Sequence, residues 1–90
     1  MREFTTFDKM KLEEFKEKLA EEIRYRRIIK LDISQEQLAE KSGLGLTTIK
    51  NLEGEKANPS LETIEKLAIA FGIQIEKLLC FDKKGREKNE

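Results

Sequence analysis

The sequence predicts an all-α fold, a small bundle of helices. Leu and Ile recur every three or four positions along most of the chain, which is the spacing of one face of an α-helix. The chain has no Val and a single Pro among its 90 residues, whereas strands are rich in β-branched residues. Charged residues make up 40% of the chain, so the apolar remainder suits the modest core of one domain.

A long first helix is expected from Asp8 to about Lys30. Its apolar positions, which share one face at helical spacing, are Leu12, Phe15, Leu19 and Ile23. Residues 1–18 are either the beginning of this helix or a separate N-terminal extension. In either case Phe4 and Phe7 are expected to contact the core or a second subunit.

Two short helices are expected next. Residues 34–37 form a capping box, with Ser first and Gln three positions later, so a helix begins here. It ends at Gly43, because glycine readily adopts the left-handed conformation that closes a helix. The following helix covers about residues 46–53 and has Ile49 and Leu52 on one face. Its opposite face has Thr47, Lys50 and Asn51.

Two more helices complete the predicted bundle. Ser60 begins the first of them and Gly72 ends it. Its apolar stripe consists of Ile64, Leu67, Ala68 and Phe71. The second is short, from about Gln74 to Cys80, and Cys80 is expected in the core or in an interface. The charged residues 81–90 form a tail that is too polar to fold alone.

The second and third predicted helices contain the residues that a helix-turn-helix requires. Such a motif needs a small residue where the helix axes approach, a flexible residue at the turn, and apolar residues that fix the second helix onto the first. Ala39 and Gly43 meet the first two requirements, and Leu44 fills the turn. Ile49 and Leu52 meet the third.

Composition argues against an enzyme, a metal site and a membrane protein. The chain has no His and only one Cys, so it can assemble neither a Cys/His nucleophile pair nor a Cys/His metal site. No cofactor is therefore expected. No apolar run approaches the roughly 20 residues of a membrane span, and no segment resembles a signal peptide. We therefore expect a cytoplasmic protein.

Three motifs resemble the Xre family of phage-repressor-like regulators, over roughly residues 19–80. They are Ser34-Gln35-Glu36-Gln37-Leu38-Ala39-Glu40-Lys41, Thr48-Ile49 with Glu53, and Asn58-Pro59-Ser60-Leu61-Glu62-Thr63. The resemblance implies a five-helix phage-repressor-like helix-turn-helix domain, here with an N-terminal helical extension at residues 1–18. It also implies a homodimer in which the third helix binds double-stranded operator DNA.

The resemblance also implies which residues contact DNA. It assigns Gln35 to a phosphate, which suits the preference of helix N-termini for anions. The residues it assigns to the major groove are Leu46, Thr47, Lys50 and Asn51. Asn can form two hydrogen bonds to adenine, Lys can donate to guanine, and Thr or Leu can contact the methyl group of thymine. Lys56 and Asn58 resemble family positions that contact the DNA backbone, which fixes register without reading sequence.

The chain departs from the family pattern at three places. Gly45 stands where the family commonly has a Ser or Thr cap. Gly54 and Glu55 reverse the usual order of a polar residue followed by Gly. The connection before the second helix is one residue longer than usual, so we align Arg27 with the family's buried Arg. We therefore expect a structural ion pair between Arg27 and Glu53.

The expected function is that of a sequence-specific transcriptional regulator, a repressor that binds a palindromic operator as a dimer. The 18 basic and 18 acidic residues give zero net charge, which is unexpected for a protein that neutralises phosphates. The alternative is an antitoxin-like module that sequesters a toxin-like partner protein. The zero net charge, the acidic stretch 13–22 and the N-terminal extension favour this alternative. The basic cluster of Arg24, Arg26 and Lys30 fits either a solvated surface or contacts to the DNA backbone.

Overall fold

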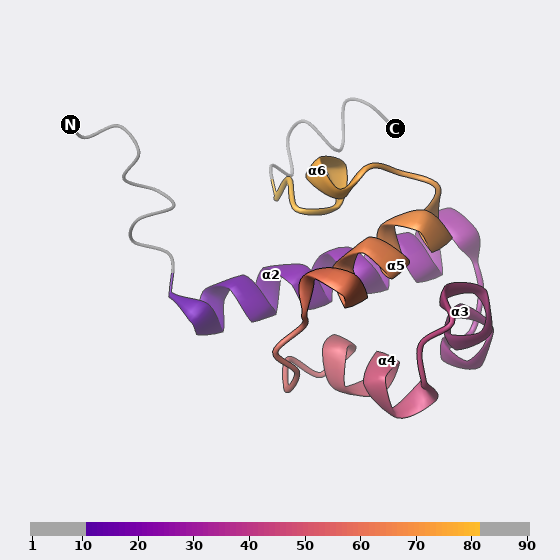
Figure 1. Cartoon of the computed structure of the whole chain (residues 1–90), viewed down its shortest axis with the longest axis horizontal. Coiled ribbons are helices and arrows are strands. Elements are labelled where there is room, and N and C mark those ends of the chain that lie inside the picture. The colour runs from indigo at the N-terminus through magenta and orange to yellow at the C-terminus, as the bar shows by residue number, and fades with distance from the viewer. Residues whose placement is uncertain (1–10, 82–90) are drawn as a thin grey trace.

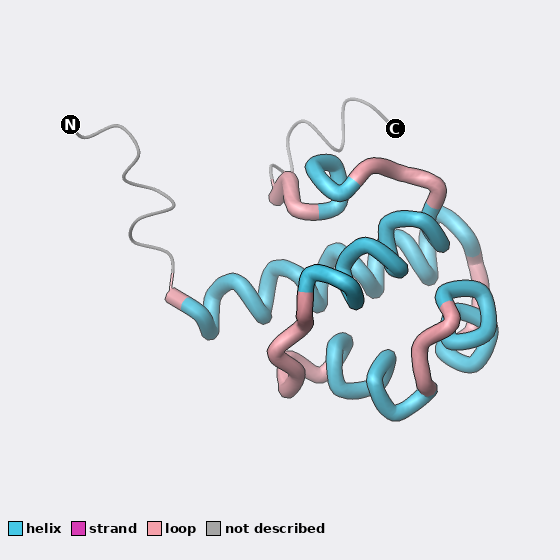
Figure 2. The backbone as a smooth tube through the Cα atoms, viewed as in Figure 1, coloured by secondary structure: helices cyan, strands magenta, loops and turns pink. Residues whose placement is uncertain are grey.

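The computed structural model describes residues 11–81, and all regular structure in this range is helical (Figure 1, Figure 2). The elements are α2 (Leu12–Tyr25), the π-helix η1 (Arg26–Leu31), α3 (Gln35–Ser42), α4 (Leu46–Glu53), α5 (Leu61–Phe71) and α6 (Ile75–Leu78). These five α-helices confirm the predicted all-α, five-helix fold. Asp8, Phe4, Phe7 and the tail from residue 82 lie outside the described residues.

The capping residues set the ends of α3 and α5 where the sequence predicts them. Ser34 Oγ accepts a hydrogen bond from Gln37 N (3.0 Å), and the Gln37 side chain accepts one from Ser34 N (2.8 Å). Ser60 Oγ accepts a backbone N–H of α5 in the same way (3.1 Å). Gly43 and Gly72 close the two helices with φ of 78° and 72°, left-handed values that glycine adopts without a steric penalty.

The first predicted helix differs from expectation in its second half. The α-helix ends at Tyr25, and the backbone continues as a π-helix through residues 26–31. Because N–H groups of a π-helix bond to the carbonyl five residues back, each turn accommodates an additional residue. The additional residue that the resemblance implies before α3 can be accommodated in this way. Asp32 follows with a left-handed φ of 55° and leads to the cap at Ser34.

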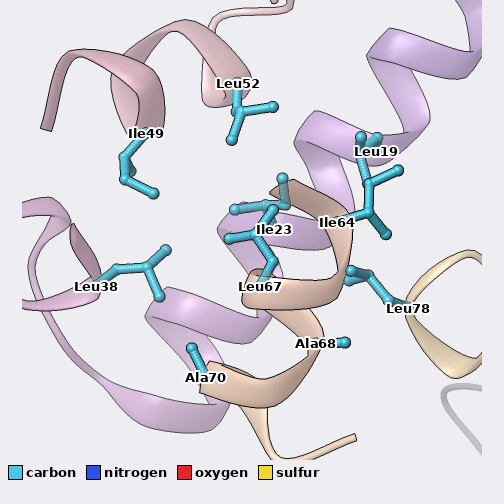
Figure 3. Packing of buried hydrophobic residues seen from close by; sticks show 10 residues of the cluster. All are labelled: Leu19, Ile23, Leu38, Ile49, Leu52, Ile64, Leu67, Ala68, Ala70 and Leu78. Atoms are coloured by element: carbon cyan, nitrogen blue, oxygen red, sulfur yellow. The ribbon is translucent and has the colours of Figure 1, made fainter. Parts of the chain in front are cut away.

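The core lies where α2 and α5 meet, and the other α-helices close around it (Figure 3). Leu19 and Ile23 of α2 point toward Ile64 and Leu67 of α5. The other buried members of this cluster are Leu38, Ile49, Leu52, Ala68, Ala70 and Leu78. α4 packs against α2 and α3, and α6 packs against α5. Among the described residues, no helix is long and apolar enough to cross a membrane.

Two side chains lie in surroundings other than those expected. Cys80 is exposed, so a position in the core is wrong. Arg26 is neither a solvated residue nor suited to contact DNA, because it is only 5% exposed. Its Nε lies 2.8 Å from Glu22 Oε2 of a side chain that is buried as well. Such burial is tolerated because each charge has its partner.

Candidate nucleic-acid interface

α4 has one side in the core and the other in solvent. Ile49 and Leu52 are 0% and 3% exposed and contact the core. The polar residues predicted for the opposite side, all three exposed, are Thr47, Lys50 and Asn51. Leu46, the first residue of α4, is half-buried. The structure therefore brings the three polar side chains together on the solvent side of one helix.

Glu53, the last residue of α4, lies at the centre of a buried polar network. Arg27 Nε lies 2.6 Å from Glu53 Oε2, and Arg27 Nη2 lies 3.0 Å from Glu53 Oε1. The two side chains are 12% and 4% exposed, so this two-point ion pair is largely removed from water. Arg27 Nη1 also donates to the carbonyl oxygen of Ile33 (2.9 Å). The structure thus contains the predicted ion pair.

Two further residues bind Glu53, and neither contact was predicted. Arg24 Nη1 donates to the main-chain carbonyl of Glu53, which suits a cation at a helix C-terminus. Gln35 Nε2 donates to Glu53 Oε1 (2.9 Å). Arg24 and Arg27 are three residues apart and so lie on one face of the first helix. From this spacing, the sequence could have predicted that both contact the same residue. Gln35 has no such signal, because 18 residues separate it from Glu53.

The network fixes the C-terminal end of α4 relative to the rest of the bundle. Its members come from α2, η1, the first residue of α3 and the last residue of α4. A buried carboxylate is stable only when it is paired and hydrogen-bonded, so the position of Glu53 depends on all of these partners. The solvent side of α4 is consequently oriented by polar contacts as well as by its core residues.

The chain after α4 turns back onto the last turn of that helix. Glu55 N donates to Leu52 O (3.3 Å), and Lys56 N donates to Asn51 O (2.9 Å). This pair of bonds is the Schellman motif that ends many helices. Lys56 and Asn58, which are predicted to contact the DNA backbone, are both exposed in this loop. Lys56 is therefore held next to the end of α4.

The reversed order of Gly54 and Glu55 has a conformational consequence. The left-handed position of a Schellman motif is usually Gly, because a Cβ is unfavourable there. In this chain it is Glu55, with φ of 66°. Gly54 has φ of −94°, an ordinary value for any residue. Gly54 therefore lies one residue before Glu55, the position whose left-handed backbone favours glycine.

The sequence profile of the helix-turn-helix family matches residues 23–78. The chain belongs to this family, the Xre-like helix-turn-helix regulators. This Xre-like chain is 46% identical over 66 residues to control protein C.SmaI of Serratia marcescens, across 73% of the chain and 77% of that protein. It is 45% identical over 53 residues to an uncharacterised helix-turn-helix transcriptional regulator of Archaeoglobus fulgidus, across 59% of the chain and 76% of that protein.

A solved structure is similar as well. The hypothetical transcription factor NHTF from Neisseria is similar with a TM-score of 0.73 and 32% identity, across 90% of this chain and 91% of that one. α3 and α4 are the helix-turn-helix of an Xre-like DNA-binding regulator. The family is not a class of enzymes. Within residues 11–81, no group of three or more His, Cys, Asp or Glu could hold a metal ion.

Proposed function

We propose that this Xre-like regulator binds a two-fold symmetric operator as a homodimer, with α4 of each subunit in the major groove. The observation that supports this most directly is the orientation of α4. Core contacts of Ile49 and Leu52, together with the network at Glu53, turn its polar side outward. The major groove admits one α-helix, and two-fold related helices contact half-sites about one turn of DNA, ~34 Å, apart.

Four residues of α4 are proposed to read the bases. Asn51 is suited to adenine, because its side-chain amide can form two hydrogen bonds to the edge of that base. The NH2 group donates to N7, and the carbonyl oxygen accepts from the N6 amino group. Lys50 donates to guanine or to a phosphate, and both it and Asn51 are exposed. Thr47 and the half-buried Leu46 contact the methyl group of thymine.

Three residues outside α4 are proposed to contact phosphates. Lys56 and Asn58 belong to the loop that folds back onto α4 and are exposed. Gln35 Nε2 uses one of its two protons for Glu53, and the second proton remains for a phosphate oxygen. Because the chain has zero net charge, affinity for non-specific DNA is expected to be weak.

The proposed dimer uses the exposed surface of α5 and α6. A groove of about 360 Å³ lies there, lined among others by Ile69, Ile73 and Ile75. Ile69 is 70% exposed, and Leu61, the first residue of α5, is 79% exposed. A two-fold interface must be complementary to itself, and this surface has both a protruding isoleucine and a groove. These features support a second copy of the chain as the occupant of this surface.

A dimer bound across a promoter excludes other proteins from the same DNA, so we propose that the regulator is a repressor. The test is selection of bound sites from random double-stranded DNA with three proteins: wild type, Asn51→Ala and Asn58→Ala. The wild-type consensus should be palindromic. Asn51→Ala should relax one position in each half-site, with a loss of ~1–3 kcal/mol in discrimination.

The Asn58→Ala variant is the matched control, because it removes the same amide from a proposed phosphate contact. It should weaken binding to all sequences alike and leave the consensus unchanged. Selection of no sequence by the wild type would refute the proposal. In a pull-down from the native lysate, capture of a partner protein in place of DNA would favour the antitoxin-like alternative.

A further inference from the structure

Glu55 combines features that are unfavourable for the folded chain. It is a non-glycine residue with a left-handed φ of 66°, a conformation that disfavours residues with a Cβ. It also adds a negative charge just beyond the C-terminus of α4, where the helix dipole is negative. Violations of local rules concentrate at functional sites, so the residue requires an explanation other than stability.

We propose that Glu55 limits the affinity of the regulator for DNA, because its carboxylate repels phosphates beside those that Lys56 attracts. The proposal rests on the proposed function, in which α4 and its following loop face DNA. It assigns a role to a residue that contributes neither a base contact nor an attractive phosphate contact. Glu55 therefore acts by charge repulsion.

The backbone contacts determine where this charge lies. The N–H of Glu55 is bonded to the carbonyl of Leu52, and the next N–H, of Lys56, is bonded to the carbonyl of Asn51. Glu55 is thus held at the end of the helix whose solvent side presents Lys50 and Asn51. The residue is exposed, so its carboxylate can approach DNA when α4 enters the groove.

The structure gives the carboxylate no competing role. Within residues 11–81 the side chain of Glu55 is in no ion pair or hydrogen bond, unlike the buried acids Glu22 and Glu53. Its charge offsets that of the adjacent Lys56. Phosphates attract the protein regardless of base sequence, so Glu55 lowers the affinity for all DNA. Binding then depends more strongly on base contacts and on dimerisation.

The test compares Glu55→Gln with Glu17→Gln in the full chain. Both variants remove one negative charge from an exposed residue, but Glu17 belongs to α2 and not to the loop that follows α4. Binding to a random-sequence duplex of about 20 base pairs is measured by fluorescence anisotropy. At about 25 mM salt, Glu55→Gln should bind roughly two- to fivefold more tightly than wild type. The gain should shrink at about 150 mM salt, because screening reduces repulsion.

A second variant, Glu55→Gly, separates charge from backbone conformation. It should show the same gain in affinity and also a higher urea midpoint of unfolding, because the left-handed position then has its preferred residue. An equal gain in affinity in Glu17→Gln would show that the effect comes from net charge and not from the position of Glu55, which would overturn the proposal. A gain in Glu55→Gly alone would assign the effect to loop conformation and would also overturn it.

Two remaining outcomes distinguish this inference from the proposed function. If wild type binds DNA and Glu55→Gln binds equally or more weakly, only the role of Glu55 is wrong. If wild type binds no duplex at low salt and also selects no sequence from random DNA, the proposed function fails and this inference fails with it.

Discussion

The Glu53 carboxylate accepts hydrogen bonds from Arg27 and Gln35, while its main-chain carbonyl accepts one from Arg24. This one residue therefore connects α2, η1, α3 and α4. Its exposed fraction is only 4%, so water cannot replace a partner that is lost. Its removal would leave the Arg27 guanidinium in a largely buried position without a counter-ion.

We predict that Glu53→Ala lowers the free energy of unfolding by ~3–5 kcal/mol, the usual cost of breaking a buried ion pair. Urea unfolding measures this change. Glu62→Ala is the matched control, because Glu62 pairs with Lys66 at 3.5 Å on the surface, with exposed fractions of 75% and 42%. That variant should change the free energy by less than ~1 kcal/mol. Equal losses in the two variants would contradict the role assigned to Glu53.

The sequence was sufficient for part of the candidate site. The pairing of Arg27 with Glu53 follows from the family resemblance, and the outward side of α4 follows from the periodicity of Ile49 and Leu52. The contact of Gln35 to Glu53 could not be predicted in the same way. It joins residues 18 positions apart, and its geometry exists only after the helices have packed.

Of the three helices α3, α4 and α5, only α4 begins without a side-chain cap. Its N-cap is Gly45, which has no side-chain acceptor, whereas α3 and α5 begin with capping serines. Gly45 has extended backbone angles that any residue adopts, φ −71° and ψ 154°. A Cβ there would meet only Thr48 Oγ1, at 3.9 Å. A serine would therefore fit without strain.

We predict that Gly45→Ser raises the free energy of unfolding by about 0.5–1 kcal/mol, by adding a cap and by restricting the unfolded chain. Gly43→Ser is the comparison, because Gly43 has φ of 78° with nothing within 4 Å of a built Cβ. Strain alone should then lower stability by ~1–2 kcal/mol. Urea midpoints of the two variants should shift in opposite directions, and shifts of the same sign would show that the caps are misassigned.

The ends of the helices could be predicted wherever a capping serine or a closing glycine stands in the sequence. Ser34, Gly43, Ser60 and Gly72 set their ends through local hydrogen bonds and backbone conformation, which depend on few neighbours. The change from α-helix to π-helix after Tyr25 had no such marker. A periodic apolar pattern predicts helix but does not distinguish hydrogen bonds to the fourth residue back from those to the fifth.

For the whole molecule, the balance of 18 basic and 18 acidic residues means that a single subunit has little general attraction for DNA. Two linked subunits contact twice as many bases and phosphates, and the second contact benefits from a high effective concentration. The proposed dimer is therefore central to affinity. Whether the dimer interface lies on α5 and α6 can be tested by changing one side chain.

We predict that Ile69→Lys produces a monomer that binds the selected operator more weakly, because a charge then lies in the proposed two-fold interface. Light scattering after gel filtration measures the mass. Ile29→Lys is the matched control, since Ile29 is also an exposed isoleucine, at 64%, but belongs to η1. A dimer that persists in Ile69→Lys, or is lost equally in both variants, would exclude this surface as the interface.

The π-helix η1 has a consequence for the length of the chain between α2 and α3. Its two isoleucines, Ile28 and Ile29, are 46% and 64% exposed, whereas Arg27 before them and Ser34 after them are anchored by side-chain bonds. The bonds of these two side chains hold both ends of the segment, so we expect a one-residue change in its length to leave the orientation of α4 unchanged.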